Sequence, residues 1–164
     1  FYTGMRSGEL LALTPTDILP NKRIDINKNY AKIKGEELFL EPKTPKAKRC
    51  ISIPDFLYDD IQEYISKLYG IGNNDRIFYF QKTALEKEMK RVSERAGLKP
   101  IRVHDLRHSH ASMLIDLGFS PLEIAERLGH ESVKTTLDTY SHLYPDKDQQ
   151  LADRLNQIRS SQGK

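Results

Sequence analysis

The sequence predicts a mainly α-helical domain with a small antiparallel β-sheet, an α+β fold, on three observations. Its 164 residues suit a single domain. Between residues 22 and 54 the chain alternates in hydrophobicity and is rich in isoleucine, a pattern typical of short strands. From residue 55 onward, apolar side chains recur at helical spacing in successive segments that glycine and proline interrupt.

The first third of the chain is expected to contain one short helix and all the strands. A helix over 7–13 ends at Thr14, because a residue that precedes proline avoids the α region. Alternating patterns then predict three short strands, over 23–26, 37–40 and 49–53. We expect the last two strands to form a hairpin whose tip is the basic segment 42–46.

The rest of the chain is expected to be helical. Apolar stripes and start and stop residues predict six helices, over 55–68, 83–97, 104–118, 121–129, 133–140 and 146–158. A short extended or turn segment at 77–80 separates the first two of these helices. Pro145 separates the last helix from the others.

The composition excludes several classes of protein. Hydrophobic residues make up 38% of the chain and mean hydropathy is −0.61, whereas a disordered chain is normally less apolar. No apolar run approaches the ~20 residues of a membrane-spanning helix, which excludes a transmembrane protein. Cys50 is the only cysteine, so an internal disulfide and a multi-cysteine metal site are excluded, and we expect a reduced, cytoplasmic setting. Because the first residue is Phe1, we expect a fragment of a longer chain.

The net charge of +3 is unevenly distributed. Residues 21–50 carry a net charge of +5 and residues 82–107 carry +4, while the remaining segments are net negative. Two interpretations remain open: a pair of solvated surfaces, or one basic face, built from both segments, that binds phosphates.

Four features are candidates for a functional site, although each has an ordinary structural explanation when taken alone. Arg6 stands at the mouth of the first predicted helix, where a surface arginine is common. Lys43 lies in the basic segment beside Lys46 and Lys48, and lysines at such a tip protect an edge strand from aggregation. On a flexible tip, a lysine could instead reach a leaving oxygen.

The other two features lie in the second half of the chain. His104 and Arg107, three residues apart, share one face at the positive N-terminal end of a helix and together make an anion site. His130 follows a Leu-Gly pair, and Tyr140 comes ten residues later. A capping or core histidine and an ordinary core tyrosine are the structural alternatives.

A metal site built from His104, His108 and His110 is a further alternative. Against it, the segment has no HExxH glutamate and Arg107 would repel a cation. His110 falls on the apolar stripe of its helix, which predicts a buried, hydrogen-bonded histidine. We therefore expect neither a metal nor a cofactor.

Taken together, the motifs resemble the tyrosine recombinase (phage integrase) family over nearly the whole chain. The resemblance rests on Thr-Gly-Met-Arg-Ser-Gly-Glu-Leu-Leu-Ala-Leu at 3–13, Pro-Lys-Thr at 42–44, Arg-Cys-Ile-Ser-Ile-Pro at 49–54, His-Asp-Leu-Arg-His-Ser at 104–109, Leu-Gly-His at 128–130 and Thr-Tyr-Ser-His at 139–142. It implies a catalytic-domain fold of that family and an active site made of Arg6, Lys43, His104, Arg107, His130 and Tyr140. Glu9 also matches an acidic position of the family and is expected to brace the site.

The resemblance implies a site-specific recombinase that works without metal or ATP. Tyr140 would attack a DNA phosphodiester, the 5′-hydroxyl would leave, and a 3′-phosphotyrosyl link would keep the bond energy for rejoining. The arginines and histidines would stabilise the charge that develops on the phosphate, and Lys43 would give the leaving oxygen its proton. A type IB topoisomerase, a non-catalytic DNA-binding module and a metal-dependent hydrolase remain the competing interpretations.

The resemblance also implies partners and a larger assembly. It describes residues 1–164 as the C-terminal catalytic domain of an integrase, encoded by a phage or mobile element in a bacterium and cut from its N-terminal DNA-binding domain. The full-length protein would bind double-stranded recombination sites and form a synaptic tetramer on DNA, with no role for a membrane. The apolar stripe of segment 146–164 predicts a tail helix that packs on its own domain, or is loosely held, when free and exchanges between protomers on DNA.

Overall fold

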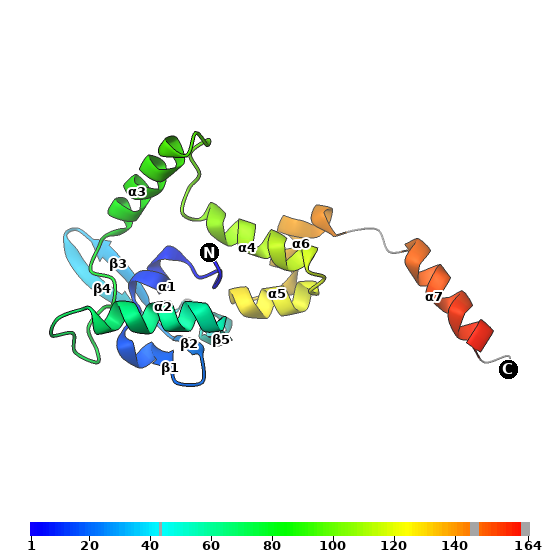
Figure 1. The fold of residues 1–164 in the computed structure, drawn as a ribbon, viewed down its shortest axis with the longest axis horizontal. Coiled ribbons are helices and arrows are strands. Elements are labelled where there is room, and N and C mark those ends of the chain that lie inside the picture. Colours follow the sequence, from blue (N-terminus) through cyan, green and yellow to red (C-terminus); the bar gives the residue numbers. More distant parts are fainter. Residues whose placement is uncertain (43, 145–147, 162–164) are drawn as a thin grey trace.

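The computed structural model describes residues 1–42, 44–144 and 148–161, with side chains in the last range at 148 and 151–158. The fold is α+β, as the sequence predicts (Figure 1). The helices are α1 (Ser7–Leu11), α2 (Asp55–Ser66), α3 (Lys82–Arg95), α4 (Asp105–Asp116), α5 (Pro121–Leu128), α6 (Val133–Tyr140) and α7 (Asp148–Ser161). The strands are β1 (Ile18–Leu19), β2 (Arg23–Ile26), β3 (Asn29–Ile33), β4 (Glu36–Leu40) and β5 (Arg49–Ser52). Three 3-10 turns complete the chain, η1 (Pro15–Asp17), η2 (Pro45–Ala47) and η3 (Ser141–Leu143).

The first half of the molecule is built on a three-stranded antiparallel sheet. Its order is β1-β2-β5, and Ile24 on β2 lies opposite Ile51 on β5. The alternation of these strands buries isoleucines on one face, where α2 packs through Leu57 and Ile61. Figure 1 shows α2 running along this sheet. This apolar core holds in place the strand that carries Arg49.

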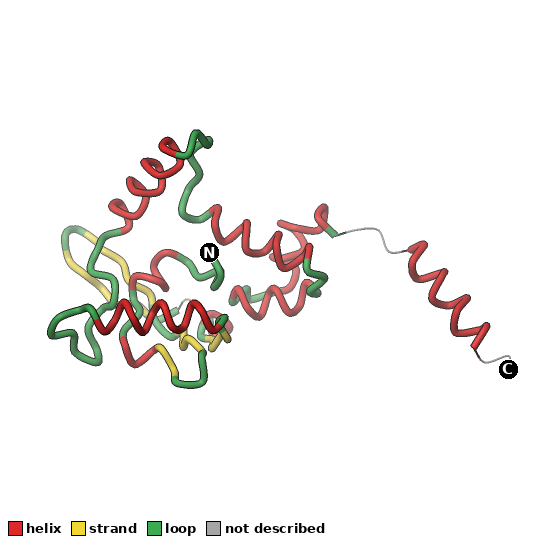
Figure 2. The backbone as a smooth tube through the Cα atoms, in the orientation of Figure 1, coloured by secondary structure: helices red, strands yellow, loops and turns green. Residues whose placement is uncertain are grey.

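The predicted hairpin between strands 37–40 and 49–53 is wrong. β4 pairs instead with β3, which the sequence analysis missed, and β5 pairs with β2. The reason is a two-residue turn at Lys34 and Gly35, where φ is 51° and 92°. Positive φ at both positions matches the twist of a tight hairpin, but a lysine at the first position is not a typical turn signal. Figure 2 shows this hairpin as the pair of yellow strands farthest from α5.

The second half of the molecule is a helical layer of α4, α5 and α6. Ala111, Leu114, Ile124 and Leu128 form its core together with Tyr140, whose side chain is 5% exposed. The predicted bounds of these helices agree with the structure to within one or two residues. The bounds agree because residues that end a helix can be recognised in the sequence. Gly129, for example, ends α5 in the left-handed conformation, with φ of 68°. This layer places His130 directly after the end of α5 and Tyr140 at the last position of α6.

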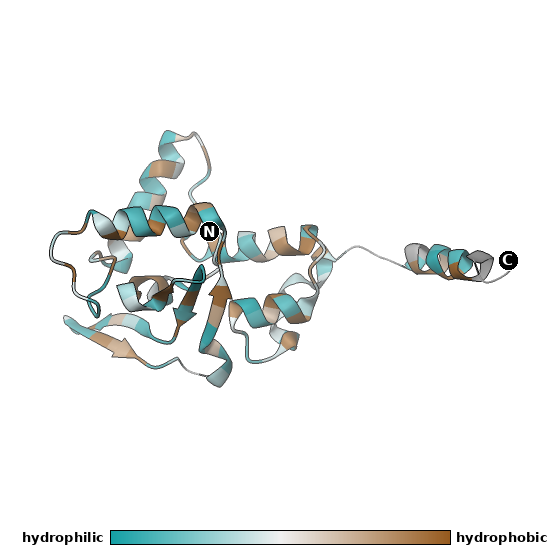
Figure 3. Cartoon of the chain, turned by 60° about the horizontal axis from the view of Figure 1, so that its bottom comes forward, coloured by the Kyte–Doolittle hydropathy of each residue, from teal (hydrophilic) through white to brown (hydrophobic). Residues whose placement is uncertain are grey.

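The last helix, α7, stands apart from the rest of the chain in Figure 1. This helix was predicted to begin at residue 146, after Pro145. Residues 145–147 lie outside the described residues. Brown and teal residues alternate along α7 in Figure 3, and its apolar residues Leu151 and Leu155 are 57% and 58% exposed. No helix within the described ranges is long and apolar enough to cross a membrane.

Candidate active site

Arg6 immediately precedes α1 and is held by the carboxylate of Glu9. Its backbone N–H donates to Glu9 Oε2 at 2.8 Å, and its Nη1 donates to Glu9 Oε1 at 2.8 Å. Its side chain is nevertheless 39% exposed. The guanidinium is therefore oriented by the protein while it stays accessible to an anion from solution.

Glu9 is also the partner of a second arginine, Arg49, which begins the predicted strand 49–53 and was not among the predicted site residues. Nη1 and Nη2 of Arg49 donate to the two carboxylate oxygens at 3.1 and 2.9 Å. Glu9 and Arg49 are only 5% and 7% exposed. Burial alone would raise the pKa of Glu9, but the hydrogen bonds from Arg49 and Arg6 outweigh it and hold the pKa below its ordinary value. Glu9 is thus a buried anion that braces Arg6, as expected.

Arg107 lies on α4 and joins three distant parts of the chain. Its Nη1 donates to the carbonyl of Gly4 at 2.7 Å, and its Nη2 donates to the carbonyl of Leu128 at 2.6 Å. Burial, and then the charge of Arg6, lowers the pKa of Arg107 to about 9, so the guanidinium keeps its proton at neutral pH. A fixed cation therefore sits between the segment that leads to Arg6 and the end of α5.

His130 follows the glycine that ends α5. Gly129 is required there, because a Cβ would meet Arg49 Nη1 at 2.8 Å in addition to the strain of a positive φ. Nδ1 of His130 shares a hydrogen bond of 2.8 Å with the hydroxyl of Thr136 on α6. Burial, and then the charge of Arg107, lowers the pKa of His130 to about 4. The imidazole is neutral at pH 7 and donates through Nε2 when the Thr136 hydroxyl donates to Nδ1.

Tyr140 is the last residue of α6, and its hydroxyl meets a histidine of α4. The distance from Tyr140 Oη to His108 Nδ1 is 2.7 Å. Burial raises the pKa of Tyr140, while the charge of Arg107 acts in the opposite direction. From the sequence, His108 was a candidate only as a metal ligand, and this contact was not predicted. The available signal was its position one helical turn after His104, on the same face of α4.

His104, which precedes α4, and the two histidines within α4, His108 and His110, make different contacts. The rings of His104 and His108 meet edge to face with centroids 4.9 Å apart. His110 is buried, as predicted, and its Nε2 accepts a hydrogen bond from Nε of Arg127 at 3.0 Å. His108 and His110 therefore contact different residues, Tyr140 and Arg127. Among the described residues, no three His, Cys, Asp or Glu side chains are grouped as metal ligands.

The electrostatic interactions show that the structure brings the candidate residues together. Burial is the main cause of the lowered pKa values of His104 and His130, and the charges of Arg107 and Arg6 add to it in both. The charge of Arg107 also reaches the phenol of Tyr140. Arg107 thus lies within electrostatic reach of the other four described candidate residues, Arg6, His104, His130 and Tyr140, although Arg6 and Arg107 are about a hundred residues apart in sequence.

Lys43, the sixth predicted residue, lies outside the described residues. Its neighbours Pro42 and Thr44 line a cavity of about 410 Å³ that Arg6 and His130 also line. Of the two alternative lysines, Lys48 pairs with Glu41 at 3.3 Å and Lys46 is exposed in η2.

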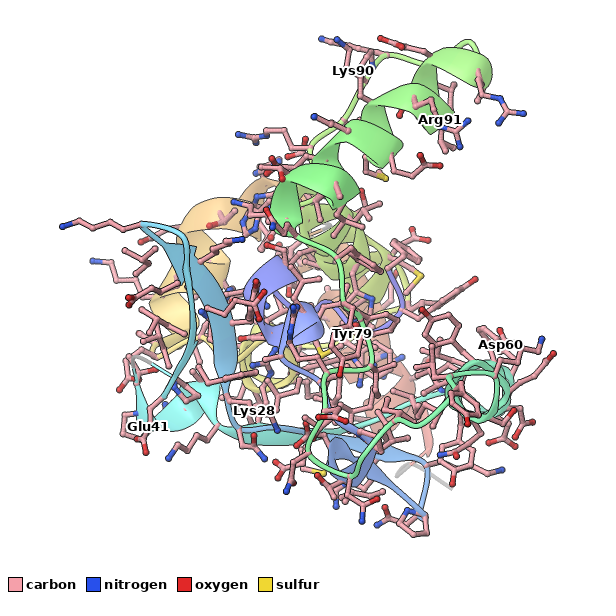
Figure 4. All side chains as sticks on the ribbon, turned by 90° about the vertical axis from the view of Figure 1, so that its left-hand side faces the viewer. Lys28, Glu41, Asp60, Tyr79, Lys90 and Arg91 are labelled. Atoms are coloured by element: carbon pink, nitrogen blue, oxygen red, sulfur yellow. The ribbon has the colours of Figure 1, made fainter. Side chains whose placement is uncertain are left out.

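Residues of both basic segments meet at a second cavity beside Arg6. This cavity has a volume of about 610 Å³, and its lining includes Lys32 from β3, Lys82 from α3 and His104. Figure 4 shows α3 projecting from the body with Lys90 and Arg91 on its outer half. There the two cations pair with acidic residues of the same helix, which is typical of a solvated surface. Lys82, at the inner end of α3, lines the cavity and also pairs with Glu86 of the same helix at 3.5 Å.

Comparison with known proteins identifies the family to which the chain belongs. The sequence pattern of the phage integrase family matches residues 1–147. The chain belongs to the phage integrase family. This integrase-family chain is 37% identical to the ICEBs1 integrase of Bacillus subtilis over 96% of its length and 47% of that protein. It is 31% identical to the integrase of Staphylococcus phage L54a, over 95% of the chain and 49% of that protein.

Solved structures of integrases share the fold. The Tn1549 transposon integrase, in complex with a circular intermediate DNA, superposes with a TM-score of 0.79 at 20% identity, over 96% of this chain and 55% of that one. The catalytic domain of bacteriophage HP1 integrase gives a TM-score of 0.61 at 24% identity, over 94% of this chain and 76% of that one. The present integrase-family chain spans about half the length of the curated relatives that it matches.

Proposed function

We propose that the chain is the catalytic part of a site-specific DNA recombinase in which Tyr140 cuts one DNA strand at a time. The phenol oxygen attacks the phosphorus of a phosphodiester, the bond to the 5′ oxygen breaks, and a 3′-phosphotyrosyl link forms. The observation that carries this proposal is the position of Arg107, within electrostatic reach of Arg6, of His130 and of the buried Tyr140 in an integrase-family chain. Reversal of the step with a different 5′-hydroxyl rejoins the strands and completes strand transfer.

The two arginines suit a reaction in which the phosphate gains negative charge. One guanidinium at ~4 Å from a phosphate oxygen stabilises it by roughly 4 kcal/mol at an effective dielectric constant of 20. Arg6 is exposed enough to bind the phosphate, and Arg107 is fixed by two carbonyls before the substrate arrives. His104 and His130, whose pKa values are lowered, act as neutral hydrogen-bond donors. This set of donors supplies the stabilisation without metal or ATP.

A covalent complex between the protein and a nicked, suicide DNA substrate tests the proposal. The integrase that carries this chain should become linked to the 3′ end of the cut strand, and the linkage should form equally in EDTA. Loss of the linkage in EDTA, restored by magnesium or zinc, would contradict the mechanism. Relaxation of a plasmid that lacks any recombination site would instead indicate a type IB topoisomerase.

Lys43 is proposed as the acid that protonates the 5′ oxygen, because its neighbours line the cavity that holds Arg6 and His130. Lys43→Ala should cleave ordinary DNA about 10²- to 10⁴-fold more slowly. It should recover on DNA whose bridging 5′ oxygen is sulfur, because a thiolate leaves without a proton. Lys46→Ala and Lys48→Ala are the matched controls. Rescue of either control variant, and not of Lys43→Ala, would move the role to that lysine.

We further propose that the chain acts with an N-terminal DNA-binding domain, on double-stranded recombination sites, as a tetramer in the cytoplasm of a bacterium that carries the phage or mobile element. The relatives support this, since they are integrases of a phage and a mobile element and are about twice as long. In that tetramer, residues 146–164 would exchange between protomers.

The exposed apolar residues of α7 allow the proposed exchange of this C-terminal segment between protomers to be tested. Leu151 and Leu155 lie four residues apart, so they occupy one side of the helix and are expected to enter a neighbouring protomer. The double variant with Leu151→Glu and Leu155→Glu should bind a single half-site normally and assemble little synaptic complex, as measured by native gel electrophoresis. Gln157→Glu adds one like charge to the same helix and serves as the control. Normal synapsis of the double variant would refute the tail's role.

A further inference from the structure

The proposed cleavage mechanism assigns no role to the contact between His108 and Tyr140. Nδ1 of His108 lies 2.7 Å from the hydroxyl oxygen that would attack DNA. The two residues come from different helices, α4 and α6, whose packing is part of the apolar core. His108 is thus a polar group held against the reacting atom by the fold itself.

We propose that His108 orients the Tyr140 hydroxyl and accepts its proton as the phosphotyrosyl bond forms. This inference rests on the proposed function. In the cleavage step, the Oη–P bond forms, the P–O5′ bond breaks, and the phenol proton moves to Nδ1 of His108. A separate acid, for which Lys43 is proposed, gives a proton to the departing 5′ oxygen. In rejoining, the phenolate of Tyr140 leaves phosphorus and takes the proton back from His108.

The burial of Tyr140 explains why an adjacent base is needed. The phenol is 5% exposed, so bulk water has little access to its proton, and burial makes that proton harder to remove. The ring of His108 is only partly buried, which gives an accepted proton a path to solvent. A neutral imidazole with its hydrogen on Nε2 presents Nδ1 as the acceptor for Oη–H.

The other candidate groups are less suited to accept this proton. Arg107 is a cation whose Nη1 and Nη2 already donate to the carbonyls of Gly4 and Leu128. Nδ1 of His130 is engaged with Thr136. His104 meets His108 ring to ring and is thereby one group removed from the phenol. Asp105, on the same helix, pairs with Arg102 at 2.8 Å.

The test uses the integrase that carries this chain and measures single-turnover cleavage of a suicide DNA substrate. His108→Ala should slow cleavage by about 10²- to 10⁴-fold, the usual contribution of a positioned base. His108→Asn keeps a hydrogen-bonding atom near the Nδ1 position but is not basic, so its rate should be intermediate. His142→Ala, which removes an exposed histidine of η3, is the matched control and should cleave at the wild-type rate.

Fluorotyrosine at position 140 separates proton transfer from a merely structural role. Fluorine lowers the pKa of a phenol, so a variant that lacks the base should regain activity. The ratio of wild-type to His108→Asn rates should therefore shrink at least tenfold when Tyr140 is replaced by fluorotyrosine. An unchanged ratio would overturn the proposal, as would His108→Ala cleavage at or above the wild-type rate. Absence of any adduct with the wild-type protein would refute the proposed function itself, a result distinct from these.

Discussion

Replacing Tyr140 by phenylalanine is expected to lower the rate of covalent DNA adduct formation by ~10⁴-fold or more, because the substitution removes the nucleophile and leaves no alternative bond to phosphorus. DNA binding should be unchanged, since the lost hydroxyl is buried and faces His108. Gel electrophoresis under denaturing conditions measures the adduct, and a mobility shift under native conditions measures binding.

Tyr144 supplies the matched control for this prediction. It lies four residues after Tyr140, packs against the same helical core, and has a pKa that burial also raises. Tyr144→Phe should therefore form the adduct at nearly the wild-type rate. An adduct that survives Tyr140→Phe and disappears in Tyr144→Phe would assign the nucleophile to Tyr144.

The second large effect is expected on stability, from Glu9→Ala. The substitution leaves the guanidinium of Arg49 buried without its carboxylate, which typically destabilises a protein by about 3–5 kcal/mol. The free energy of unfolding from a denaturant titration measures this. The exposed pair of Lys67 and Glu63 provides the control, because Glu63→Ala removes an ion pair that water already screens. If Glu9→Ala and Glu63→Ala were equally stable, the buried ion pair would not hold the site together.

The pH dependence of this contribution has a definite sign. The folded state lowers the pKa of Glu9, so its ion pairs stabilise the fold above the ordinary glutamate pKa. That stabilisation is lost as the pH falls through the lowered value. The difference in stability between wild type and Glu9→Ala should accordingly narrow on acidification.

The sequence predicted the helices well because their signals are local. Apolar spacing and terminal residues such as Gly129 act within a few positions of one another. Strand pairing was harder to predict, because the register depends on which strands a turn joins. Lys34 adopts a positive φ that its type does not favour, so the hairpin of β3 and β4 had no typical turn signal.

The site was predictable from motifs, while its internal contacts were not. Arg6 and Arg107 were named through the family resemblance, and only the folded chain shows that they lie within electrostatic reach of one another. Arg49 belongs to a run of basic residues, and nothing in that pattern distinguishes a buried cation from a solvated one. The position of His108 one helical turn after His104 placed the two on the same helix face, but the contact of its ring with Tyr140 depends on how α4 packs against α6.

Peptide mapping of the covalent DNA adduct tests the central claim most directly. The integrase would be trapped on a suicide substrate in EDTA, digested with protease and nuclease, and analysed by mass spectrometry. The account predicts a single phosphotyrosyl modification on Tyr140. A nucleotide linked to any other residue, or a cut strand with no residue attached, would contradict it.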